Sequence, residues 1–119
     1  MLASRIAEVA DGVISLRQTL ERRPHIYSLT IYDLGSADYD LVLPLSIVVE
    51  EYGPGEGALA RCPELEIFGD GVTAADAIGE VKSAMLDLYD ELVATDPTTL
   101  GDLPLAWLRL LKKVVKTAA

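Results

Sequence analysis

Apolar side chains recur at spacings of three and four residues in three parts of the chain, which predicts three amphipathic helices. The clearest helix covers roughly 74–93, after Thr73 at the N-cap position and with Asp76 three residues later, a pairing similar to a capping box. Its apolar stripe consists of Ala74, Ile78, Val81, Met85, Leu88 and Leu92. Because such a stripe needs a sheet or another helix to cover it, we expect this helix at the centre of the fold.

The first helix is predicted from about Ser4 to Arg22, with Ser4 as a candidate cap and Pro24 beyond its end. Gly12 costs this helix about 1 kcal/mol relative to alanine. A hairpin turn at Asp11–Gly12 is the alternative, but the flanking residues do not alternate, so a helix is favoured. Its apolar positions are Leu2, Ile6, Val9, Val13, Leu16 and Leu20. This stripe has two candidate positions, within its own domain or against the same helix of another subunit.

A last helix is predicted after the connector 95–101, with Asp102 as its cap and Pro104 tolerated in its first turn. One face carries Trp107, Leu108, Leu110, Leu111, Val114 and Val115, and the opposite face carries Arg109, Lys112, Lys113 and Lys116. Basic amphipathic helices can bind membranes or target proteins. We favour a helix docked on its own domain with the basic face in solvent, since cations in the last turn suit the helix dipole.

Between these helices, apolar and polar residues alternate in the way that predicts strands. One strand covers 26–33. In a second stretch, 39–49, Pro44 must interrupt the strand, bend it or place it at an edge, because proline has no N–H for a ladder. Further strands are expected at 57–61 and at 65–68. We expect Gly69-Asp70-Gly71 to end the last of these strands, because glycine accepts positive φ.

The short connection between 26–33 and 39–49 favours antiparallel neighbours. The first strand should therefore occupy one edge of an all-antiparallel sheet. No strand is expected after the central helix. The predicted fold class is α+β: a small antiparallel sheet of three to four strands with the central helix packed on it, plus an N-terminal and a C-terminal helix. We expect one domain over 1–119, divided into an N-terminal helix (1–24), a core (25–93) and a connector with the C-terminal helix (94–119).

The net charge of −9 argues against a general nucleic-acid binder, because phosphate contacts need clustered Lys and Arg. Residues 102–119 carry +3, which leaves −12 on the rest of the chain. An acidic body can attract a basic protein partner, or it can simply keep the protein soluble. We see no signal peptide or membrane span, and the single Cys62 fits a reducing compartment. We therefore expect a cytoplasmic protein.

Side chains capable of chemistry are few and scattered. His25 has no ligand or nucleophile at a useful spacing, and the loop Gly53–Gly57 joins two strands and lacks the lysine of a phosphate-binding loop. The acids of the central helix are Asp76, Glu80, Asp87, Asp90 and Glu91. They could suggest a metal or acid–base site, but exposed carboxylates mostly solvate a helix. We expect no catalytic, cofactor-binding or metal-binding residues.

Residues 45–93 resemble the HicB-like antitoxin family. The resemblance rests on Cys62-Pro63-Glu64-Leu65, a glycine turn and Thr73-Ala74-Ala75-Asp76-Ala77, preceded by a strand pair at 47–52 and 57–61. Val72 stands where the family usually has Asp, and the family's C-terminal DNA-binding module has no obvious counterpart here. The resemblance covers well under half of the chain.

The resemblance implies a partial RNase H-like fold without catalytic acids, and a non-enzymatic function. In that family, such a domain neutralises a small basic HicA-type ribonuclease toxin by masking it. It therefore implies a small basic protein as partner and no DNA binding by this chain alone. The alternative is a solitary HicB-like domain that associates with itself, with a structural or regulatory role. Under both hypotheses we expect a homo-oligomer.

Overall fold

The computed structural model describes residues 24–118. The predicted N-terminal helix, and the question of what it packs against, lie outside the described residues. The elements in chain order are β2 (His25–Ile31), β3 (Tyr39–Leu41), β4 (Leu45–Glu51), β5 (Ala58–Cys62), β6 (Ile67–Gly71), α2 (Ala74–Val93), the 3-10 helix η1 (Pro97–Thr99), α3 (Asp102–Val114) and β7 (Val115–Thr117). The fold is α+β, as the sequence predicts.

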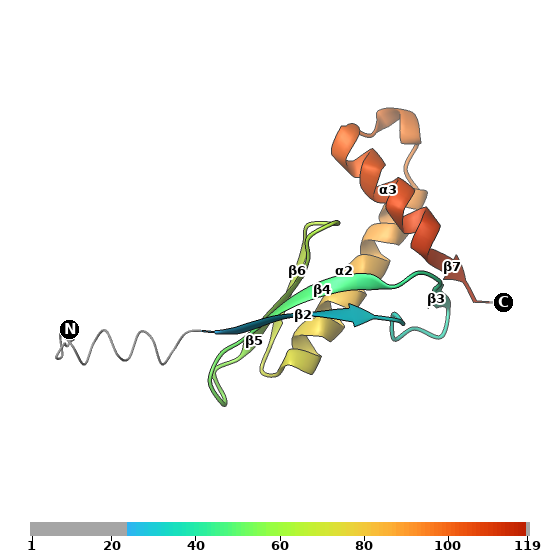
Figure 1. Cartoon of the computed structure of the whole chain (residues 1–119). Helices are drawn as coiled ribbons and strands as arrows, with labels where there is room; N and C mark the ends of the chain where they lie inside the picture. Colours follow the sequence, from blue (N-terminus) through green and yellow to red (C-terminus); the bar gives the residue numbers. More distant parts are fainter. Residues whose placement is uncertain (1–23, 119) are drawn as a thin grey trace.

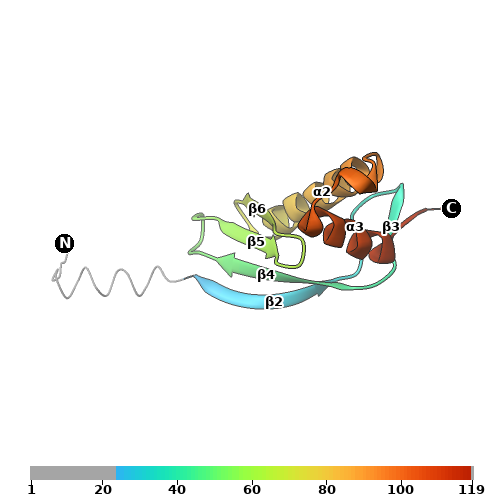
Figure 2. The same ribbon diagram turned by 90° about the horizontal axis from the view of Figure 1, so that it is seen from above.

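The main sheet has four strands in the order β2-β4-β5-β6, and every neighbouring pair is antiparallel. The expected pairing of the first strand is confirmed, with Tyr27 opposite Val49 and Ile31 opposite Leu45. Figure 2 shows β2 along one edge of the sheet and α2 beyond its other side, near β6. α2 covers one face of the sheet and packs mostly on β6 and β5, less on β4.

Pro44 interrupts the stretch 39–49, which is one of the three outcomes that the sequence allows. Pro44 separates β3 from β4, and β3 leaves the main sheet to pair antiparallel with β7. The expectation that no strand follows the central helix is therefore wrong, because Val115–Thr117 forms β7 at the end of α3 (Figure 1). Val115 was predicted on the apolar face of the helix, and it stays buried as the first residue of the strand. β7 is only three residues long, too short for a period to show.

The predicted strand at 65–68 is shifted towards the C-terminus. Leu65 and Glu66 belong to the tight turn between β5 and β6, and Glu66 has a φ of 53°. β6 continues through Gly71, so the expected turn at Gly69-Asp70-Gly71 is wrong. The glycines serve close packing instead. A Cβ on Gly69 would lie 2.6 Å from the carbonyl oxygen of Ala77, and one on Gly71 would overlap Cβ of Asp76. Neither glycine has a positive φ.

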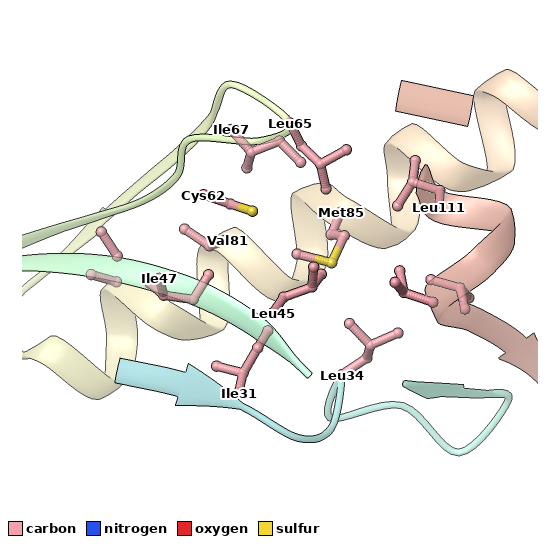
Figure 3. Close-up of a cluster of buried hydrophobic side chains, with 14 of the residues drawn as sticks. Ile31, Leu34, Leu45, Ile47, Cys62, Leu65, Ile67, Val81, Met85 and Leu111 are labelled. Atoms are coloured by element: carbon pink, nitrogen blue, oxygen red, sulfur yellow. The ribbon is translucent and has the colours of Figure 1, made fainter. Parts of the chain in front are cut away.

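α2 begins as predicted. The hydroxyl of Thr73 accepts a hydrogen bond from the backbone N–H of Asp76 at 3.1 Å, which confirms the cap. Within α2, Val81, Met85 and Leu92 are buried as expected, with Ala77 in addition, while Ala74, Ile78 and Leu88 are partly buried. Figure 3 shows Val81 and Met85 pointing towards Ile47 and Leu45 of β4 and Cys62 of β5. These side chains form the interior between α2 and the sheet.

The C-terminal helix α3 is present, but Gly101 rather than Asp102 occupies its N-cap position, and no side chain caps it. Asp102 is in the first turn, where its charge suits the helix dipole. Leu108, Leu111 and Val114 are buried, and Arg109, Lys112 and Lys113 are exposed as predicted. Figure 3 shows Leu111 on the side of the core next to Met85, so α3 closes the far end of the core.

Candidate interaction surface

The face of the sheet opposite α2 is the largest uncovered surface of the main sheet. Since side chains alternate between the faces of a strand, each strand that buries residues under α2 places its other residues here. Among residues 24–118 no helix or loop covers this open face. Its members are Ile26, Ser28 and Thr30 of β2, Ser46, Val48 and Glu50 of β4, Leu59 and Arg61 of β5, and Phe68 and Asp70 of β6.

The centre of the open face is apolar and slightly hollow. A depression of about 290 Å³ is lined by Val48, Glu50, Leu59, Arg61, Phe68 and the edge of Ala60. Phe68 is 71% exposed and Leu59 43% exposed, which is unusual for large apolar side chains on a regular strand. Val48, Arg61 and Phe68 lie side by side in one cross-strand row. Exposed aromatic and Arg side chains around a hollow are the residue types that dominate protein–protein contacts.

Close packing on the other face fixes the position of Phe68. Gly69 and Gly71 let α2 approach β6 so closely that no side chain fits there. The residues that alternate with these glycines along β6, Phe68 and Asp70, must therefore point to the open face. The sequence does predict Glu66 and Phe68 on the face opposite Leu65 and Ile67, but alternation alone does not tell which face is covered. The spacing of Gly69 and Gly71 is the feature of the sequence that indicates the covered face. Small residues at alternate positions of a strand mark the face that a helix approaches.

Carboxylates lie around the apolar centre. Glu50 and Asp70 are on the open face itself, and the β5–β6 turn exposes Glu64 and Glu66 at the end of the same hairpin. Arg61 is the one cation on this face among residues 24–118, and no carboxylate of that part of the chain lies within ion-pair distance of it. The arrangement is an apolar hollow with a mostly acidic surround.

The acids of α2 do not form a site. All five are exposed, and two have structural partners. Glu80 Oε1 accepts the backbone N–H of Asp70 at 3.2 Å, and Asp90 Oδ1 accepts the hydroxyl of Tyr39 at 2.8 Å. The bond to Asp90 raises the pKa of Tyr39 above its ordinary value. No group of three or more His, Cys, Asp or Glu suited to a metal ion occurs among the described residues.

The other residues considered for chemistry or ligand binding also lie apart from one another. His25 lies at the start of β2, with its ring centre 5.3 Å from that of Tyr27. Gly53–Gly57 is the expected hairpin connection between β4 and β5, closed by a hydrogen bond from Tyr52 N–H to the Gly57 carbonyl at 3.0 Å. Cys62 is buried under α2, and this burial raises the pKa of its thiol and disfavours a reactive thiolate.

In the part of the chain that the structure covers, no helix is both long enough and apolar enough to cross a membrane. Comparison of the chain with protein-family models, with curated proteins and with solved structures found no match in any of the three.

Proposed function

We propose that this chain is a non-enzymatic protein-binding module, similar to a HicB-type antitoxin, that neutralises a small basic ribonuclease of the HicA type. The observation that carries the proposal is the open face of the sheet, with Leu59 and Phe68 exposed, Val48 partly exposed beside them, and carboxylates around all three. The resemblance of residues 45–93 to the family supports the same proposal.

The physical basis is complementarity. An RNA-cleaving protein must present a basic surface to phosphates, and a partner that covers this surface blocks access to RNA. The apolar centre around Phe68 would supply the burial that holds the two proteins together. Glu50, Asp70, Glu64 and Glu66 would match the cations and speed the encounter, in a chain whose net charge is −9.

The proposal assigns no catalytic, cofactor-binding or metal-binding role to any residue of this chain. We also propose that the chain acts in the cytoplasm, because a toxin that cleaves cellular RNA has to be neutralised where that RNA is. The single Cys62, buried and unpaired, is compatible with a reducing compartment.

The test begins with the reading frame next to this gene, which should encode a short basic protein. The two purified full-length proteins are mixed, binding is measured by calorimetry, and cleavage of a labelled RNA is followed. We expect a complex and loss of cleavage at equimolar ratio. Phe68→Asp should weaken binding at least tenfold, because it places a charge at the apolar centre.

Leu103→Asp provides the control, since Leu103 is also an exposed large apolar residue but lies on α3, outside the sheet. It should bind like wild type, and circular dichroism should show both variants folded. The proposal fails if no short basic protein is encoded nearby, if the two proteins do not bind, or if Phe68→Asp binds as tightly as the control.

A further inference from the structure

The two edges of the main sheet differ in how they are protected. At one edge, β6 is only five residues long, and α2 packs tightly against its glycines. Glu80 of α2 also takes the backbone N–H of Asp70, so a side chain already occupies one of the main-chain donors of this strand. Short strands and side chains that occupy edge groups are common ways to stop another strand from adding.

At the other edge, β2 has none of these protections. It has seven residues, His25–Ile31, with no proline, lysine or acid among them. Its only strand neighbour is β4, so no strand within residues 24–118 pairs with its outer side. A long edge strand without charges is a ready template for a further strand.

The helix layer is also incomplete over β2. Tyr27 and Leu29 point to the side of the sheet that α2 covers, because they lie opposite the buried Val49 and Ile47. Yet both remain only partly buried, since α2 sits mostly over β6 and β5 at the far side of the sheet. A further strand beyond β2 would remove more of the apolar surface of Tyr27 and Leu29 from water.

We propose that β2 pairs antiparallel with β2 of a second copy of this chain, which joins the two sheets into one of eight strands. Charge favours a second copy as the partner. Two copies of a chain with net charge −9 repel over most of their surface, but two β2 strands bring no like charges together when His25 is neutral. The two-fold arrangement also places Tyr27 and Leu29 of both copies in one apolar row.

This dimer does not depend on the proposed function. It uses the outer edge of β2, whereas the proposed partner surface is centred on Phe68 at the opposite side of the sheet. A dimer built in this way would leave both open faces free, so it would carry two partner surfaces.

The experiment measures the mass of the full-length chain by analytical ultracentrifugation over a range of concentrations. Wild type should sediment as a dimer. The double variant Ser28→Lys, Thr30→Lys should raise the dissociation constant at least tenfold, because exposed side chains of the two β2 strands would then repel. Ser46→Lys is the matched control. Ser46 lies opposite Thr30 on the same face, but on the inner strand β4, so this variant should remain a dimer.

Hydrogen exchange of wild type provides a readout that does not require the variants to fold. The amides of 25–31 that do not bond to β4 should lose protection when the protein is diluted below the dissociation constant, while those of β5 should not. The proposal is overturned by a monomeric wild type, by a double variant that dimerises like the control, or by β2 amides whose protection does not change with concentration.

Discussion

At the residue scale, the N-cap of α2 is a single hydrogen bond with a measurable contribution. Thr73→Ala removes the hydroxyl that accepts the N–H of Asp76, and it should lower the free energy of unfolding by about 1 kcal/mol. Thr73→Ser keeps an acceptor and should cost much less. Urea unfolding of the three proteins gives the comparison, and equal midpoints for the alanine and serine variants would show that the cap does not contribute.

Gly69 and Gly79 make opposite predictions for the same substitution. A Cβ at 69 would meet the backbone of α2, with Ala77 O at 2.6 Å and Val81 N at 2.9 Å, so Gly69→Ala must push the helix away from the sheet. We expect a loss of about 1–3 kcal/mol, the usual cost of overpacking. A Cβ at Gly79 meets nothing within 4 Å, and Gly79→Ala should stabilise the exposed helix by up to about 1 kcal/mol. Thermal unfolding that moves in the same direction for both variants would contradict this packing.

At the element scale, the segment between β2 and β3 is tied to α2 by an ion pair. Lys82 Nζ lies 3.0 Å from Asp33 Oδ1, and the same carboxylate oxygen accepts the backbone N–H of Gly35. The hydrogen bond from Lys82 is the main reason that the pKa of Asp33 lies below its ordinary value. The hydroxyl of Tyr39 makes a second link to α2 through Asp90.

The sign of the resulting pH dependence follows from the lowered pKa. The stability that Asp33 contributes is fully present above the pKa of an unfolded aspartate, about 3.9, and is lost as the pH falls through the lower folded value. Asp33→Asn should therefore be less stable than wild type at pH 7, and the difference should shrink below about pH 4. Urea unfolding at several pH values tests this. A difference that stays constant down to the acid range would show that the pair does not contribute, and the effect should be modest because Asp33 is exposed.

The sequence predicts well those elements that have a long hydrophobic pattern or an end marked by a capping residue. The seven-residue alternation of β2 and the long stripe of α2 with Thr73 at its cap are confirmed by the structure. β7 could not be predicted, because three residues show no period, and its pairing with β3 joins segments far apart in the chain. The sequence predicts a turn at Gly69 and Gly71, because it does not show that α2 packs against these two glycines in the folded chain.

The candidate surface was predictable only in part. The sequence places Phe68 on the opposite face of its strand from Ile67, and its acidic composition is compatible either with a basic partner or with solubility alone. The exposure of Phe68 and Leu59 depends instead on which face α2 covers and on what lies over the other face, and both are properties of the tertiary structure. This is why no residue of the open face was a candidate before the fold was known.

At the scale of the whole molecule, we expect no hydrolase or nuclease activity. The acids of α2 are exposed along the helix, and nothing within residues 24–118 desolvates them or holds them together. The pure protein should not cleave a labelled RNA in the presence of Mg²⁺ or Mn²⁺ above the rate of a buffer control. Metal-dependent cleavage that disappears in Asp76→Asn or Glu80→Gln would contradict this expectation.

The central claim is that the open face of the sheet binds a basic protein partner. The most direct measurement is a side-chain chemical-shift map of the full-length chain during titration with the basic protein encoded beside it. The account predicts that the methyl and aromatic signals of Val48, Leu59 and Phe68 change, while those of Leu103 and Val93, exposed apolar residues on the two helices, stay in place. Changes confined to the helices, with the signals of Leu59 and Phe68 unmoved, would contradict it.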